Sequence, residues 1–253
     1  MFRGDDAHGR GGALGGEMMA SDIDQHATLQ TKERYNRIAR VYDSMELMME
    51  GQFRHWRQKL WAQGRGNVLE VGVGTGKNRP YYPVGAKVIA VDIAEQMLAV
   101  ARQRAHDLGV EVDLREGDIQ CLDFPDDSFD TVVATCVFCS VPDPLLGLRE
   151  VERVVKPDGQ ILLLEHVRSD HPVVGPLMDL LSPLTSRLWG ASINRPTVRT
   201  VEQAGLQIES IRDLGPMGIV KSIVARPGRS TSTPQHYAME SFAGSRETEA
   251  LTR

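Results

Sequence analysis

Apolar residues recur along the chain in two alternating patterns, short continuous runs and longer stretches at helical spacing. The runs at 67–72, 86–93 and 160–167 consist mostly of Val, Ile, Leu and Ala, which is typical of buried parallel strands. Between them, 94–108 and 143–156 carry apolar residues at helical spacing. Strands that alternate with helices predict an α/β fold, with a mainly parallel sheet covered on both faces.

The same patterns continue toward the C-terminus. They predict strands at 110–118, 129–141, 207–215 and 218–227 and a helix at 195–206. The last two strands flank Gly215 and Gly218, which favours an antiparallel hairpin. The apolar segment Pro172–Trp189 contains Pro176 and Pro183, and we expect broken helices there. The sequence therefore predicts a doubly wound, mainly parallel sheet of seven strands with a C-terminal hairpin.

The length of 253 residues suits one large domain, which we place at 28–227. Residues 28–64 show helical spacing throughout and form a predicted N-terminal helical cap. The flanking segments 1–27 and 228–253 are rich in polar residues, and the first also in glycine, so we expect them to be disordered.

Composition narrows the function classes. A net charge of -5 argues against nucleic acid as a partner, because phosphate binding needs clusters of basic residues. No apolar run approaches the roughly 18–20 residues of a membrane span. The three cysteines, Cys121, Cys136 and Cys139, lack the spacing of a zinc site, so we predict no metal. Reduced thiols of this kind favour a cytoplasmic protein.

The stretch VLEVGVGTGKN at 68–78 carries the first chemical signal. Gly72, Gly74 and Gly76 follow a predicted strand, where glycine allows a sharp turn and lets a ligand approach the main chain. Glu70 precedes them and could hold a cationic ligand. Asp92 ends the next strand about twenty residues later, the usual separation of a ribose-binding acid.

Further motifs follow in order, with Asp118 in EGDIQ, then DTVVATCVFCSVPDP and VVKPDGQILLLEH. This series resembles the class I S-adenosylmethionine-dependent methyltransferases over roughly residues 30–226. The resemblance implies a Rossmann-like fold and an enzyme that converts S-adenosyl-L-methionine to S-adenosyl-L-homocysteine.

The resemblance also implies roles for individual residues. Glu70, Gly72, Gly74 and Gly76 would line the loop that cradles the methionine part of the cofactor. Asp92 would bind the ribose hydroxyls and Asp118 the adenine amino group. The residues flanking the adenine ring or touching the cofactor elsewhere would be Ile93, Ile119, Cys136 and Tyr35.

Two branches of the family are similar to this chain in different parts. The N-terminal part resembles quinone-pathway C-methyltransferases and bacterial phospholipid N-methyltransferases, in which the tyrosine of a YD pair approaches the cofactor. The resemblance makes Tyr42 a candidate catalytic residue, with packing of a lid helix as the alternative. The later CSV, EHV and N-R-x-T motifs resemble alkyl-thiol S-methyltransferases. We therefore expect a small hydrophobic acceptor, with a thiol first and a phospholipid amine or quinone-like carbon second.

Four residues are candidates for acceptor chemistry. His166, at the end of a predicted strand, could take a proton from a thiol, or it could only shape the pocket. Asn194 and Arg195 could bind a polar acceptor group or cap a helix. Trp56 belongs to an apolar stripe with Phe53 and Leu60, which forms either core or an acceptor pocket.

The segment 172–195 falls where this family often builds a substrate cap. Its apolar residues leave peripheral membrane contact open.

Three other functions are weighed against this one. An oxidoreductase usually has GxGxxG, and GVGTGKN does not provide that spacing. An arsenite methyltransferase would use several cysteines, but strand alternation would point Cys136 and Cys139 to different sides. A non-catalytic regulator would bind the cofactor without turnover, and the complete glycine–acid series argues against it.

Overall fold

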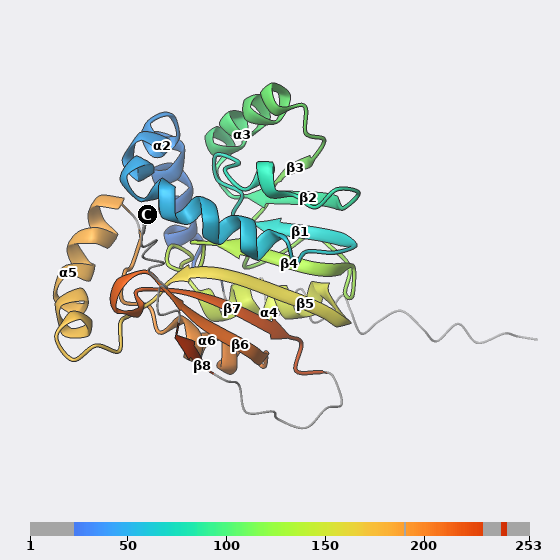
Figure 1. Ribbon diagram of the computed structural model, residues 1–253. Helices are drawn as coiled ribbons and strands as arrows, with labels where there is room; N and C mark the ends of the chain where they lie inside the picture. The colour runs from blue at the N-terminus through green and yellow to red at the C-terminus, as the bar shows by residue number, and fades with distance from the viewer. Residues whose placement is uncertain (1–22, 190, 230–238, 242–253) are drawn as a thin grey trace, which may run out of the picture.

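The computed structural model describes residues 23–189, 191–229 and 239–241, and Figure 1 shows one sheet with helices on both sides. The strands are β1 (Asn67–Val71), β2 (Lys87–Asp92), β3 (Asp113–Glu116), β4 (Phe129–Thr135), β5 (Val155–His166), β6 (Gln207–Leu214), β7 (Val220–Arg226) and β8 (Met239–Ser241). The helices are α2 (Gln25–Trp61), α3 (Glu95–Leu108), α4 (Pro144–Val154), α5 (Val174–Trp189) and α6 (Thr197–Gln203). Two short 3-10 turns are η1 (Arg79–Tyr81) and η2 (Pro216–Gly218).

The strands are ordered β3-β2-β1-β4-β5-β7-β6-β8. The first five are parallel to one another, and β7 is antiparallel to both β5 and β6. The predicted parallel sheet and C-terminal hairpin are therefore confirmed. The strand order reverses between β1 and β4, and ligands of such sheets bind beyond the carboxyl ends of the strands at that point.

The ends of the chain only partly overlap the described residues. The short strand β8 pairs with β6 inside the predicted tail 228–253 and brings the sheet to eight strands. Positions 1–22 of the predicted leader, and 230–238 and 242–253 of the tail, lie outside the described residues. Helix α2 begins at Gln25, three residues before the predicted cap, because the Asp24 carboxylate accepts hydrogen bonds from the N–H groups of His26 and Ala27.

Alternate residues of β4 pack into two separate cores. Val132 lies with Leu148 and Val151 of α4 in the larger cluster. Val133 lies with Leu60 and Trp61 of α2 in the second cluster, on the other face of the sheet. Because successive strand residues point to opposite faces, the continuous apolar run of β4 buries side chains under both helical layers.

Strand β4 ends at Thr135, so the prediction of a strand to residue 141 is wrong. Cys136 has a left-handed backbone with φ of 56°, which turns the chain out of the sheet. Beyond it, the N–H groups of Val137 and Phe138 donate to the Glu165 carboxylate and not to a neighbouring strand. The strand-alternation argument about Cys136 and Cys139 therefore does not apply, since both residues follow the strand.

The predicted broken helices of 172–189 form one continuous helix, α5. Pro176 lies in its first turn, where backbone N–H groups have no partner within the helix and proline is tolerated. Pro183 lies inside the helix and removes one hydrogen bond without ending it.

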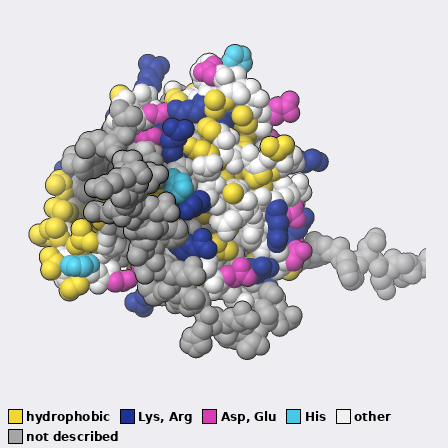
Figure 2. Space-filling model, in the orientation of Figure 1, with side chains coloured by type: hydrophobic (Ala, Val, Ile, Leu, Met, Phe, Trp, Pro, Cys, Tyr) yellow, Lys and Arg dark blue, Asp and Glu magenta, His cyan; other side chains and the backbone are white. Residues whose placement is uncertain are grey.

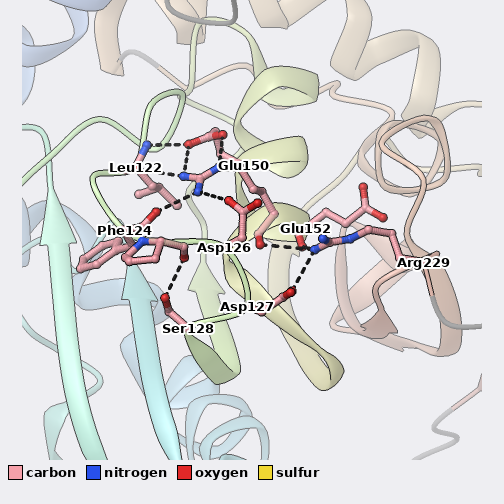
Figure 3. A network of polar contacts seen from close by, with 10 residues as sticks. Leu122, Phe124, Asp126, Asp127, Ser128, Glu150, Glu152 and Arg229 are labelled. Carbon is pink, nitrogen blue, oxygen red and sulfur yellow. Dashed lines mark hydrogen bonds and ion pairs between the residues drawn. The ribbon is translucent and has the colours of Figure 1, made fainter. Parts of the chain in front are cut away.

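A polar network holds the loop before β4 against α4 (Figure 3). Arg153 donates to the carbonyl oxygens of Leu122 and Phe124 at 2.9 and 2.8 Å and to the Asp126 carboxylate at 2.7 Å. Glu150 accepts from the Leu122 N–H at 2.8 Å. These contacts fix the chain that leads away from the carboxyl end of β3.

Candidate active site

The three glycines after β1 all have left-handed backbones, with φ of 65° at Gly72, 56° at Gly74 and 78° at Gly76. A Cβ on Gly72 would lie 2.5 Å from Val137 Cγ2, so a side chain has no room there. A Cβ on Gly74 would meet no atom within 4 Å. Glycine at 72 thus lets the β4–α4 loop pack closely, whereas glycine at 74 leaves the main chain open to a ligand.

Asp92, at the carboxyl end of β2, is joined to this turn by hydrogen bonds. Its Oδ2 accepts from the Gly74 N–H at 2.8 Å and its Oδ1 from the Ala94 N–H at 2.9 Å. Burial raises the pKa of Asp92 to about 6 and outweighs the backbone hydrogen bonds, which act to lower this pKa. The predicted acid and the predicted glycine loop therefore form one unit.

A cleft lies at the carboxyl ends of β1, β2 and β4 and encloses about 710 Å³, its open mouth included. Eight predicted cofactor residues line it: Gly72, Gly74, Asp92, Ile93, Asp118, Ile119, Cys136 and Tyr35. Tyr42 lines it as well. Thr31, Met97 and Ser140 also line the cleft and were missed, since the pattern assigned them to helix faces or to a strand.

Glu70 and Gly76 are not among the residues that line this cleft. Glu70 is fully buried behind the turn, where its carboxylate accepts from Asn78 Nδ2 at 2.6 Å and from the Tyr82 hydroxyl. Burial raises its pKa to about 7 despite these donors. Glu70 therefore braces the turn from behind.

The loop after β4 depends on a second buried acid, Glu165. One of its oxygens accepts from the N–H groups of Val137 at 2.9 Å and Phe138 at 3.3 Å. Burial raises the pKa of this carboxyl to about 8. By holding the loop, Glu165 places Cys136 and Ser140 on the wall of the cleft.

Helix α2, at the N-terminus of the domain, forms one wall of the cleft. The Tyr35 hydroxyl and Ser140 Oγ are 2.5 Å apart, which joins the helix to the β4–α4 loop. The Thr75 hydroxyl donates to the Asp43 carboxylate at 2.6 Å, which joins it to the glycine turn. Tyr35 and Tyr42 contact each other edge to face at 6.2 Å between ring centroids.

A second chamber of about 1,110 Å³, its open mouth included, shares Tyr35, Tyr42, Cys136 and Ser140 with the cleft. Its other walls come from five parts of the chain: α2, Cys139 in the loop after β4, the end of β5, α5 and the loop after α5. They include Ile38, Phe53, Arg57, His166, Thr185, Ala191 and Ile193. The His166 ring lies 5.6 Å from the Phe53 ring between centroids. Two adjoining spaces of this kind can bring two ligands together at the shared wall.

The three residues predicted to contact an acceptor lie outside this chamber. Trp56 packs on Phe53 and lines a different hollow with Gly215. Asn194 accepts a hydrogen bond from the Ser182 hydroxyl at 2.6 Å and donates one to Asp179 at 3.1 Å, so it connects the loop after α5 to that helix. Arg195 donates to the Val141 carbonyl at 3.2 Å. Phe53 and Ile193, close to these positions in sequence, line the chamber in their place.

Cysteine ligands for a metal are not gathered in the described part of the chain. No group of three or more His, Cys, Asp or Glu side chains there could hold an ion. Cys121 is exposed, whereas Cys139 is buried with its thiol donating to the Cys136 carbonyl at 3.4 Å. Within the same residues, no helix combines the length and hydropathy that a membrane crossing requires.

Comparison with known proteins agrees with this geometry. Residues 69–163 match the methyltransferase domain family. A phosphatidylethanolamine N-methyltransferase of Cereibacter sphaeroides is 39% identical over 140 residues, which cover 54% of this chain and 67% of that protein. A demethylmenaquinone methyltransferase of Renibacterium salmoninarum is 32% identical over a region that covers 64% of this chain and 68% of that protein. A thiol S-methyltransferase of Rattus norvegicus is 32% identical over a region that covers 66% of this chain and 70% of that protein.

Solved structures share the fold. A methyltransferase of Thermotoga maritima, described as a possible histamine N-methyltransferase, superposes with a TM-score of 0.60 at 20% identity, covering 77% of this chain and 99% of that one. The YcgJ protein of Bacillus subtilis superposes with a TM-score of 0.52 at 29% identity, covering 61% and 69%.

A glycine turn joined to a buried strand-end acid, beside a cleft on a reversing parallel sheet, defines a nucleoside-binding α/β enzyme. With these relatives, the chain belongs to the S-adenosylmethionine-dependent methyltransferases. Its cofactor is S-adenosyl-L-methionine, and the open main chain at Gly74 together with the buried Asp92 suits that molecule.

Proposed function

We propose that the enzyme transfers a methyl group to a small hydrophobic acceptor bound in the second chamber, and that the acceptor is a thiol. The observation that carries the proposal is the shared wall of the two spaces, formed by Tyr35, Tyr42, Cys136 and Ser140. An acceptor in the chamber meets the cleft there, among side chains such as Ile38, Phe53 and Ile193. The match to a thiol S-methyltransferase supports the choice of sulfur.

Within the cleft, each group has an assigned task. Asp92 would accept hydrogen bonds from the ribose hydroxyls and Asp118 from the adenine amino group, and Ile93 and Ile119 would flank the ring. When bound, the cofactor supplies a methyl group on a sulfonium centre. Tyr35 and Tyr42 cover the junction and exclude water, and this positioning can lower a barrier by several kcal/mol.

His166 lies on the chamber wall at the end of β5, in a position to take the acceptor's proton. A free thiol has a pKa near 8.5, so most of it is protonated at neutral pH and needs a base to become the nucleophile. The imidazole would accept the proton from sulfur as the methyl group is transferred.

The segments 28–64 and 172–195 together form the acceptor cap. The first contributes Ile38 and Phe53 to the chamber, and the second contributes Thr185, Ala191 and Ile193. The predicted cap segments thus account for most of the apolar wall, although not through Trp56, Asn194 or Arg195.

Labelled cofactor offered with a panel of alkyl thiols, phosphatidylethanolamine vesicles, quinols and arsenite tests the acceptor. Methylated thiols detected by mass spectrometry are the expected result. Activity on amines, phenols or carbon acceptors alone would remove the thiol proposal. For His166, the His166→Ala variant should be slowed at neutral pH and should recover as the pH rises toward the thiol pKa near 8.5, where the acceptor ionises without a base. An unaltered rate–pH profile would dismiss the base.

A phospholipid amine is the second candidate, favoured by the surface beside the chamber. Apolar side chains gather over α5 in Figure 2, and the exposed ones are Val173, Leu177, Leu180, Leu181 and Leu184. Thr185 of the same helix lines the chamber, so a lipid in a membrane surface could reach it from there. The similarity to a phosphatidylethanolamine N-methyltransferase supports this alternative.

A further inference from the structure

A cluster of charged side chains joins α2 to the glycine turn. Glu50 lies at its centre, with its carboxylate 2.7 Å from Arg57 Nη1 and 3.2 Å from Lys77 Nζ. Lys77 Nζ is also 3.6 Å from the Asp43 carboxylate. Arg57 is only 6% exposed and Lys77 is half-buried, so these charges are largely withdrawn from water. Withdrawing charge from water is costly and needs a compensating partner.

The two cations of this cluster line a recess beside the cofactor cleft, and Glu50, which is paired with both, lines the neighbouring acceptor chamber. Arg57 and Lys77 line the recess together with Thr75 and Asn78 of the glycine turn. The recess shares Tyr42, Gly72, Gly74, Thr135 and Cys136 with the cleft, so the two spaces adjoin. The Nε of Arg57 is buried and has no hydrogen-bond partner among the described residues.

The acid that precedes the glycines is not available for a ligand at this recess. Both oxygens of Glu70 are engaged, by Asn78 and by Tyr82, and the residue has no exposed surface. The charged groups that do border the recess come from α2 and from Lys77. Arg57 and Glu50 both precede the matched domain at 69–163.

The cofactor is charged at one end, where an α-amino group and a carboxylate make a zwitterion. Such a group needs a cation and an anion side by side when it leaves water. We propose that Arg57 and Lys77 bind the carboxylate of the cofactor's amino-acid end and that Glu50 binds its ammonium group. Helix α2 then contributes to cofactor binding directly, in addition to covering the cleft.

Comparing the affinities of two ligands distinguishes a role of Arg57 in cofactor binding from a purely structural role. S-adenosylhomocysteine carries the amino-acid end, whereas 5′-methylthioadenosine keeps the adenosine and the thioether but lacks it. Calorimetry on Arg57→Met should show about a 10- to 100-fold loss of affinity for the first ligand, the size expected for a lost charge-assisted hydrogen bond. Affinity for the second ligand should stay within about twofold of the wild type.

The matched control is Arg54→Met, which removes an exposed arginine from the same helix and should change neither affinity. Lys77→Met and Glu50→Gln should reproduce the selective loss more weakly. If Arg57→Met does not fold, as judged by thermal unfolding, Lys77→Met carries the test. An unchanged affinity for S-adenosylhomocysteine, or an equal loss for both ligands, would overturn the proposal. Because no acceptor is present, the outcome is independent of whether the acceptor is a thiol.

Discussion

The cofactor cleft and the acceptor chamber share one wall but are built in different ways. The cleft takes most of its residues from the ends of β1, β2 and β4, all within the matched domain at 69–163. The chamber takes its residues from α2, the end of β5, α5 and the loop after it, and most of these lie outside that domain. Local backbone geometry therefore defines the cofactor site, whereas helix packing defines the acceptor site.

This difference has a physical basis in the sheet. Parallel strands end at one edge, so acids and glycines that follow them meet there whatever surrounds them. The helices that close the chamber have no such constraint, and small changes in their packing alter its shape. The cleft should thus respond to changes in backbone and charge, and the chamber to changes in side-chain volume.

The largest effect is expected at Asp92. In Asp92→Ala the N–H groups of Gly74 and Ala94 lose their acceptor and the proposed ribose contact disappears, so affinity for S-adenosylhomocysteine should fall about 100-fold or more. Calorimetry measures the loss, and Asp107→Ala, on the exposed face of α3, serves as the control. Unchanged affinity in Asp92→Ala would refute the assignment of this residue.

Gly72→Ala should destabilise the fold by about 2–4 kcal/mol, since alanine is strained at φ of 65° and its Cβ would lie 2.5 Å from Val137 Cγ2. Urea unfolding gives the value. Adding Val137→Ala removes the clash and should restore part of the stability, leaving the backbone strain. If the second change restores nothing, the close approach of the loop is not the cause.

Glu165→Gln should change the pH dependence of stability. The raised pKa of about 8, against an ordinary 4.5, means that the folded protein retains a proton which the unfolded chain releases. The corresponding stability is fully present below about pH 4.5 and is lost as pH rises through about 8.

Glutamine cannot ionise but still offers an acceptor to Val137 and Phe138. Between pH 5 and 8.5 the wild type should therefore lose about 1–3 kcal/mol more than the variant in denaturant unfolding. Asp92 and Glu70 contribute with the same sign to both proteins and cancel in the difference. Parallel curves for the two proteins would contradict this origin of the pH dependence.

The smallest effect is expected at Ile193. Ile193 lines the chamber and not the cleft, so Ile193→Ala enlarges the acceptor space alone. The KM for the acceptor should therefore change several-fold. Affinity for S-adenosylhomocysteine should stay within about twofold. A comparable loss of cofactor affinity would show that the two spaces are less independent than their walls indicate.

Much of the cleft could be predicted because its signals are local. A strand followed by Gly72 and Gly74 requires a turn wherever it occurs, and an acid at the end of the neighbouring parallel strand lies beside that turn. The extent of β4 could not be predicted in this way. The chain leaves the sheet at Cys136 because Glu165, from the next strand, binds the backbone N–H groups that follow.

The acceptor side was less accessible from the sequence because a helix turns by about 100° per residue. The apolar stripe of α2 contains both Phe53 and Trp56, and only the packing of that helix decides that Phe53 faces the chamber. The side chain of Asn194 could form hydrogen bonds with an acceptor or with neighbouring protein groups. The position of α5 decides that it contacts Ser182 and Asp179.

The amino-acid sequence by itself determined the parallel sheet, the glycine turn and the acid at the end of β2, because each follows from residues close together in the chain. Only the tertiary structure decided that Glu70 is enclosed behind the turn, that Arg57 reaches the recess beside it and that Glu50 pairs with Arg57. The reason is that the partners of a buried charge are chosen by which elements pack together, and these partners lie far apart in the sequence.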